Sequence, residues 1–176
     1  MRVTAGGQSV ASRAPHVSRR PPVCLVHGEV YMDKNGLKPF FVERPLQVRT
    51  YDIDFFGIIS NIVYIRWLED LRLEMLKQYF PLEGQLRNGF APVLARTRIE
   101  YKRPLDIRST VVGRMWVSDI DYRRWTVIAN IVADGKTAAA AEQVGTFVSM
   151  SDGRPIKVPD ELLSKYRALT QVQDGV

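Results

Sequence analysis

The sequence predicts an α+β fold in which one long central helix is wrapped by a curved antiparallel sheet of about five strands. Three observations lead to this prediction. An alternating strand pattern over residues 41–50 is followed by a helical apolar periodicity that continues to Tyr79. Four stretches of strand pattern then follow one another, and a short helix over residues 159–169 ends the domain. Because these strands do not alternate with helices, an antiparallel sheet is favoured over a parallel one.

The first strand and the helix are marked by their own signals. Residues 41–50 alternate roughly between apolar and polar side chains, and Pro45 within them indicates a sheet edge or a bulge. Ser60 or Asn61 is a suitable residue to cap the start of the helix, and Pro81 ends it. The apolar stripe of the helix consists of Tyr64, Leu68, Leu71 and Met75, at positions i, i+4, i+7 and i+11.

The later strands are expected over residues 91–101, 110–117, 124–133 and 136–150. Asp134-Gly135 is a strong signal for a two-residue hairpin turn between the last two. The four alanines at 138–141 favour helix by propensity. We still predict strand there, because the Asp-Gly turn and the Val144–Met150 run enclose them.

Residues 1–31 differ from the remaining 145 residues. They contain four arginines, no lysine and a single acidic residue, Glu29, and are rich in Ser, Gly and Pro. This segment is predicted to be a disordered extension, with an organelle-targeting segment as the alternative. Residues 32–176 are predicted to form one domain. Deletion of residues 1–31 is therefore expected to leave activity within a few-fold of the full chain.

Composition excludes several classes of protein. Hydrophobic residues make up 45% and charged residues 25%, which is typical of a globular domain. No apolar run approaches the roughly 18–20 residues that a bilayer-spanning helix needs. Half of the net charge of +6 lies in residues 1–31, and no motif mixes aromatic and basic residues. We therefore expect a cytoplasmic protein with no membrane or nucleic-acid partner.

The positions of histidine and cysteine restrict the chemistry. Both histidines, His16 and His27, and the one cysteine, Cys24, lie in the predicted extension. The predicted domain therefore has no side chains for a Ser-His-Asp or Cys-His centre or for histidine-ligated metal. Catalysis in this domain would depend on carboxylates, hydroxyls, lysines or backbone dipoles, and no metal or cofactor is expected.

The segment from Val48 to Glu69, VRTYDIDFFGIISNIVYIRWLE, resembles the signature of hotdog-fold thioesterases of the 4-hydroxybenzoyl-CoA type. That signature is Asp-x-Asp-x-x-Gly-His-x-Asn-Asn-x-x-Tyr-x-x-Trp-x-Glu. Ile58 replaces its histidine and Ser60 its first asparagine. Farther on, residues 101–105 resemble the family's Tyr-x-x-Pro-Leu strand end, and the resemblance extends over residues 40–150. The matching residues are Asp52, Asp54, Gly57, Asn61, Tyr64, Trp67 and Glu69.

The chemistry of this segment can also be argued from its residues. A carboxylate at Asp54, shortly before a helix, can act as nucleophile or as general base on a thioester carbonyl. Free N–H groups at the helix N-terminus, near Asn61, would polarise that carbonyl. The resemblance implies the same roles and an acyl-CoA or acyl-carrier-protein thioesterase. Asp54, Gly57 and Asn61 form the predicted catalytic set, and Asp52 is expected to shape the turn.

The predicted substrate-binding residues fall into two groups. An apolar rim that favours a fatty or aromatic acyl group consists of Phe55, Phe56 and Ile58. Tyr64 is also a predicted substrate-binding residue. Coenzyme A, which enters as part of the substrate, carries phosphates that attract basic side chains. The pair Arg123-Arg124 resembles a basic cluster that related thioesterases place against the nucleotide.

Other functions of the same fold depend on different residues. Hotdog enzymes that hydrate or dehydrate acyl thioesters use a histidine, which residues 32–176 lack. A non-catalytic acyl-thioester-binding protein on the same fold is the main alternative. In either case a homodimer or homotetramer is expected, because a single curved sheet leaves a strand edge exposed.

Overall fold

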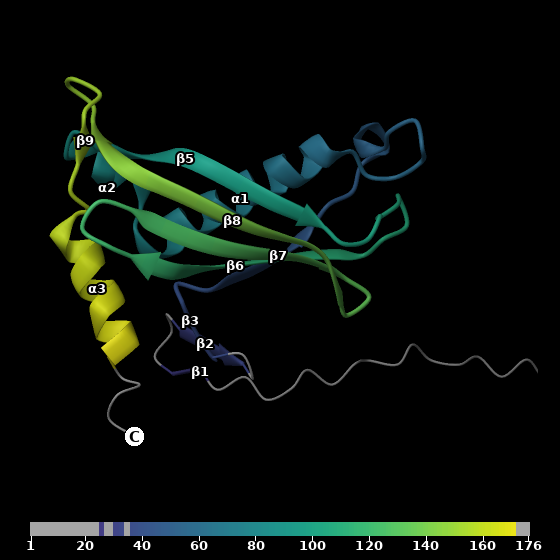
Figure 1. The fold of residues 1–176 in the computed structure, drawn as a ribbon, viewed down its shortest axis with the longest axis horizontal. Coiled ribbons are helices and arrows are strands. Elements are labelled where there is room, and N and C mark those ends of the chain that lie inside the picture. The colour runs from purple at the N-terminus through teal and green to yellow at the C-terminus, as the bar shows by residue number, and fades with distance from the viewer. Residues whose placement is uncertain (1–24, 27–29, 34–35, 172–176) are drawn as a thin grey trace, which may run out of the picture.

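The computed structural model describes residues 25–26, 30–33 and 36–171 and confirms the predicted α+β architecture (Figure 1). Helix α1 (Asn61–Tyr79) packs along one face of an antiparallel sheet. The strand order is β4-β6-β7-β8-β5, with β9 beside β8. The strands are β4 (Val42–Leu46), β5 (Phe90–Tyr101), β6 (Val111–Ile120), β7 (Trp125–Ala133), β8 (Lys136–Ser149) and β9 (Pro155–Ile156).

Helix α1 buries the predicted stripe against the sheet. Leu71 lies above Gly113 of β6, where an added Cβ would come within 2.8 Å of a Leu71 methyl carbon. The helix can therefore approach the sheet closely at this point. The fully or nearly fully buried residues of α1 are Val63, Tyr64, Trp67, Leu68, Leu71, Met75 and Tyr79.

The central strands alternate between the two faces of the sheet. In β7 every second residue from Trp125 to Ala133 is buried under the helix. The alanine run at 138–141 lies within β8, as predicted, because pairing with β7 and β5 overrides its helix propensity. Asp134 and Gly135 both have positive φ, 52° and 71°, which suits the turn that joins β7 to β8.

Two helices complete the described fold. The predicted C-terminal helix is confirmed as α3 (Asp160–Gln171), which buries Leu162 and Leu163 at one end of the sheet (Figure 1). Helix α2 (Leu82–Arg87), a single short helix between Pro81 and β5, was not predicted from the sequence. No helix within the described residues is long and apolar enough to cross a membrane.

A small second sheet precedes β4. It consists of β1 (Leu25–Val26), β2 (Val30–Asp33) and β3 (Gly36–Pro39). The ring of Tyr31 stacks on Phe41 with centroids 4.3 Å apart, and the Lys38 ammonium lies 4.4 Å from the Trp116 ring centroid on β6. The predicted boundary after residue 31 therefore falls within β2. Residues 1–24 and 27–29, with both histidines and the cysteine, lie outside the described residues.

Candidate active site

A small hairpin over residues 52–60 leads directly into α1. Ile53 and Ile59 form an antiparallel bridge. The Asp54 N–H donates to the Ile58 carbonyl at 2.8 Å, and the Ser60 N–H donates to the Asp52 carbonyl at 2.9 Å. Gly57, whose φ is +78°, closes the tip, and its N–H donates to the Asp54 carbonyl. Because that N–H is occupied, Gly57 shapes the loop that carries Asp54 and does not offer a donor to a ligand.

The Asp54 carboxylate is half-buried and is held by its own loop. Its Oδ1 accepts the Phe56 N–H at 2.8 Å and the Ile58 N–H at 3.4 Å. No hydrogen bond from any described residue reaches its Oδ2. The side chain is therefore oriented through one oxygen, while the other is free to accept a proton or attack a carbon.

Asp52 has a different environment. Its side chain is buried, with 5% of its surface exposed. Its Oδ2 accepts the Arg49 N–H at 2.9 Å, and its own N–H donates to the Arg49 carbonyl. These bonds fix the short 3₁₀ turn over residues 50–52, as expected for a residue that shapes the turn.

The N-terminus of α1 has two uncommitted donors. Ser60 caps the helix without a side-chain hydrogen bond, and the first turn contains no acidic residue. The Val63 N–H donates to the Ser60 carbonyl, but the N–H groups of Asn61 and Ile62 have no acceptor among the described residues. These N–H groups and the positive end of the helix dipole can stabilise negative charge that develops on a carbonyl oxygen.

A groove of about 240 Å³ opens beside this helix end. On one wall, the Tyr101 ring meets Tyr64 edge-on with centroids 5.1 Å apart, and its hydroxyl donates to the Asn61 carbonyl at 3.4 Å. Burial raises the pKa of both phenols, so both remain protonated donors at neutral pH. The groove is lined by Ile58, Ile59, Asn61, Tyr64, Tyr101, Lys102, Arg103 and Pro104.

Tyr101 is not among the site residues predicted from the sequence. Its one signal was the Tyr-x-x-Pro-Leu resemblance at the end of β5. Of the two cations next to it, Arg103 donates to the carbonyls of Ala133 and Lys136, at 3.0 and 2.9 Å, and so ties the β7–β8 turn to β5. Lys102 forms only a loose ion pair with Glu100, at 3.5 Å, and is the more available cation at the groove.

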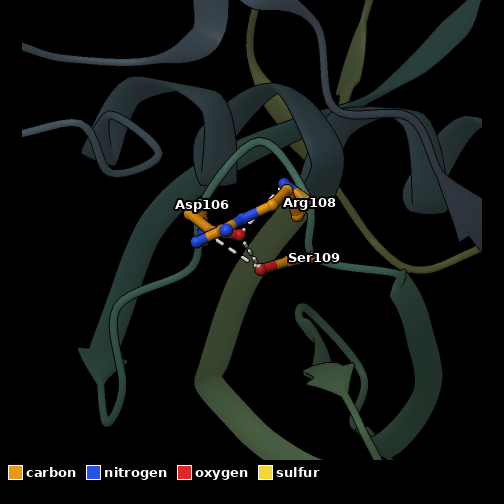
Figure 2. Close-up of polar contacts among 3 residues, drawn as sticks. All are labelled: Asp106, Arg108 and Ser109. Carbon is orange, nitrogen blue, oxygen red and sulfur yellow. Dashed lines mark hydrogen bonds and ion pairs between the residues drawn. The ribbon is translucent and has the colours of Figure 1, made fainter.

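The loop after Pro104 supports the hairpin. The Leu105 carbonyl accepts the Ile59 N–H at 2.8 Å. Figure 2 shows the turn that follows, in which the Asp106 carboxylate accepts from the Arg108 guanidinium at 3.1 Å and from the Ser109 hydroxyl at 3.0 Å. The Arg108 side chain, then Ser109 and the Arg108 N–H, lower the pKa of Asp106. The turn therefore holds Leu105 in place beneath the site.

Two of the predicted apolar residues are exposed to solvent, and two lie at the groove. Phe55 and Phe56 are 92% and 77% exposed at the tip of the hairpin, with their ring centroids 4.6 Å apart. Ile58 lines the groove, and Tyr64 lies in the core with its ring at the groove wall. The hairpin thus brings an apolar tip to the same end of the molecule as Asp54 and Asn61.

Arg123 and Arg124 directly precede β7 and lie at the other end of the sheet from Tyr101. Tyr101 pairs with Ala139 of β8, whereas Trp125, next to Arg124, pairs with Gly145. The six residue steps along β8 from Ala139 to Gly145 span about 20 Å. The two arginines line a separate groove of about 380 Å³ together with Arg96. Within one chain the structure does not bring them to Asp54.

The signature residues Trp67 and Glu69 face a third region. With Arg66 and Asp70 they line a cleft of about 810 Å³ between α1 and β4, on the opposite side of the helix from Tyr101. Glu69 also forms an ion pair with Arg72. The described residues contain no cluster of three or more His, Cys, Asp or Glu side chains that would hold a metal ion.

Comparison with known proteins identifies the class. The antiparallel sheet around a central helix is the hotdog fold of solved thioesterases. The family model of the thioesterase-like superfamily matches residues 48–166, and the chain belongs to that superfamily.

Three relatives illustrate the range of the superfamily. The acyl-acyl carrier protein thioesterase ATL3, chloroplastic, of Arabidopsis thaliana is 25% identical over 138 residues, which cover 77% of this chain and 73% of the relative. The DHNA-CoA thioesterase structure from Staphylococcus aureus superposes with a TM-score of 0.66 at 18% identity, covering 76% of this chain and 91% of that one. A thioesterase from Thermus thermophilus, complexed with coenzyme A and Zn, gives 0.64 at 24% identity, covering 73% and 92%. At these identities the two structures establish the fold alone.

Proposed function

We propose that this protein hydrolyses an acyl thioester carried by coenzyme A or by an acyl carrier protein. The observation that carries the proposal is the hairpin over residues 52–60, which holds Asp54 with one free carboxylate oxygen and leads directly to the free N–H groups at the start of α1. A base or nucleophile and an oxyanion site are the two parts that hydrolysis of a thioester needs.

Hydrolysis of the thioester needs only Asp54, the free N–H groups of α1 and water. With Asp54 as general base, its Oδ2 takes a proton from water, and the hydroxide attacks the thioester carbon. The carbonyl oxygen gains negative charge against the N–H groups of Asn61 and Ile62. When the carbonyl re-forms, the C–S bond breaks, and the thiolate leaves with the proton returned from Asp54. With Asp54 as nucleophile, its Oδ2 attacks the thioester carbon, the C–S bond breaks and the thiolate leaves with a proton from water. A second water molecule then hydrolyses the resulting mixed anhydride and regenerates the carboxylate.

The carrier and the acyl group are supported by different features. The relatives include one named for acyl-acyl carrier protein and one structure that contains coenzyme A. The exposed rings of Phe55 and Phe56 favour a fatty or aromatic acyl group, which includes substrates of the 4-hydroxybenzoyl-CoA type. Lys102, at the edge of the groove, is the nearest available cation for a phosphate of the carrier.

We also propose that the active form is a dimer formed through β5. This 12-residue strand pairs with β8 on one side and has no strand partner on the other among the described residues. The opposite edge, β4, has five residues and contains Pro45. A two-fold axis that joins two copies of one strand pairs them antiparallel.

Antiparallel pairing of two β5 strands would bring Arg123 and Arg124 of one subunit close to the Asp54 site of the other, from which they are distant within one chain. It would set the Phe90 end of one strand beside the Tyr101 end of the other. The groove that holds Arg96, Arg123 and Arg124 would then lie beside the Asn61 site of the other subunit. In this arrangement Arg123 and Arg124 bind the carrier phosphates in the partner's site.

The direct test is a panel of acyl-CoA and acyl-carrier-protein substrates, aliphatic and aromatic, with thiol release as the readout. We expect turnover by the full-length protein and a loss of about 10²- to 10⁴-fold in kcat for Asp54→Asn, with the melting temperature unchanged. Binding of these thioesters without turnover would instead support the acyl-binding alternative.

A further inference from the structure

Tyr101 links the edge strand β5 to the first turn of α1. Its hydroxyl donates to the Asn61 carbonyl at 3.4 Å, so it contacts the residue whose N–H is free at the helix start. Its ring packs edge-on against Tyr64, whose ring in turn meets Trp67 edge-on at 5.3 Å. A chain of three aromatic rings therefore runs from the sheet edge into the helix.

This link matters because the helix start lacks its usual support. Ser60 makes no side-chain cap, and no carboxylate lies in the first turn to bind the free N–H groups. An uncapped first turn frays, and its N–H groups then lose a fixed direction. Two backbone bonds hold the segment before the helix: Ser60 N–H to Asp52 and Ile59 N–H to Leu105. The only described side chain that donates to the first turn itself is that of Tyr101.

We infer that Tyr101 is a positioning residue, whose hydroxyl fixes the first turn of α1 so that the Asn61 and Ile62 N–H groups stay aimed at the substrate carbonyl. The inference rests on the proposed function. A hydroxyl of this kind would act through Asn61 and would not need to touch the substrate. It would therefore change the rate of the chemical step more than the strength of substrate binding.

The test variant is Tyr101→Phe, which keeps the ring and its contact with Tyr64 and removes only the hydroxyl. The matched control is Tyr166→Phe on α3, where the phenol also donates to a backbone carbonyl, that of Ser118 at 3.0 Å, at the far end of the sheet. We expect kcat to fall about 3- to 10-fold in Tyr101→Phe, with KM within twofold. The control should lose stability to a similar or greater extent with kcat unchanged.

Amide hydrogen exchange gives a readout that needs no substrate. Residues 63–65, whose N–H groups are hydrogen-bonded in the first turn of α1, should exchange faster in Tyr101→Phe than in the parent and at the parental rate in Tyr166→Phe. If the protein hydrolyses no thioester at all, the proposed function fails while this result still decides the role of Tyr101. Unchanged exchange at residues 63–65 would overturn the inference, as would a raised KM with kcat unchanged, which would make Tyr101 a substrate contact.

Discussion

Asp52 and the backbone of Arg49 form two hydrogen bonds in opposite directions, one through the buried Asp52 carboxylate and one through the Asp52 backbone N–H. Asp52 Oδ2 accepts the Arg49 N–H at 2.9 Å, and the Asp52 N–H donates to the Arg49 carbonyl at 3.0 Å. Asp54, two residues later, leaves one carboxylate oxygen without a partner among the described residues. The two aspartates of one short loop therefore differ in whether their side chains are available for chemistry.

This difference predicts opposite effects for the two amide variants. In Asp52→Asn the amide oxygen can still accept the Arg49 N–H, so we expect kcat to stay within about fivefold of the parent and the melting temperature to fall by about 1–4 °C. Thiol-release kinetics and thermal unfolding measure both. A loss of kcat in Asp52→Asn as large as that in Asp54→Asn, at unchanged stability, would contradict the assignment of the base to Asp54.

The packing of Trp125 on β8 predicts a strong effect on stability. A Cβ at Gly145 would lie 2.0 Å from Trp125 Cζ2 and 2.5 Å from the Val93 carbonyl oxygen. Because the ring is buried and the oxygen belongs to a paired strand, neither can move freely, and Gly145→Ala should destabilise the fold by about 2–3 kcal/mol. Urea unfolding provides the measurement.

Gly84→Ala is a matched control for that variant. Gly84 lies in α2, its φ is not positive, and nothing lies within 4 Å of an added Cβ. Alanine there should stabilise the protein by about 0.4–1 kcal/mol, because it restricts the unfolded chain and favours helix. Equal effects of the two glycine substitutions would show that close packing at Gly145 is not the cause.

The turn in Figure 2 predicts a pH dependence of stability. The Arg108 side chain, Ser109 and the Arg108 N–H lower the pKa of Asp106 below its ordinary value of 3.8, so the unfolded chain binds a proton at a higher pH than the folded chain does. The stabilisation is complete above that ordinary value and is lost as the pH falls through the lower folded pKa. Asp106→Asn should therefore melt below the parent at pH 7, with the difference shrinking below about pH 3.8. A constant difference from pH 7 to pH 2 would exclude this origin.

Sequence patterns predicted the parts of the fold whose signals are local and repeated. The stripe from Tyr64 to Met75, the turn at Asp134-Gly135 and the strand alternation each have a period or a turn type that few other structures share. Helix α2 was missed because six residues are too few to show a period. Strands β3 and β9 were missed because four and two residues are too few to show an alternating pattern.

The candidate site was predicted only in part for a related reason. Asp54, Gly57 and Asn61 lie within eight residues, so their spacing alone places them on one loop and one helix start. Tyr101 reaches this site from 40 residues away through strand pairing, which no local pattern records. Arg123 and Arg124 were grouped with the site by residue type, although the register of β7 on β8 places them at the far end of the sheet.

Because these arginines lie far from Asp54 of their own chain, a mixed dimer can show which subunit supplies them to each active site. One subunit carries Asp54→Asn, the other carries Arg123→Ala with Arg124→Ala, and each bears a different affinity tag. If the arginines serve the partner's site, the mixed dimer has one complete site, in which the second subunit supplies Asp54 and the first supplies both arginines. It should show about half the parental kcat with the parental KM.

The same mixed dimer gives a different result if the arginines serve their own subunit. Its one site with an intact Asp54 would then lack both arginines, and KM would stay as high as in the homodimer of the double-arginine variant. Tandem purification through both tags isolates the mixed species, and sedimentation at micromolar concentration establishes that it is a dimer. Because Arg123 and Arg124 lie about 20 Å along the sheet from the Tyr101 end of β5, we expect the recovery of KM. A fully active parental monomer would refute both the dimer and the shared site.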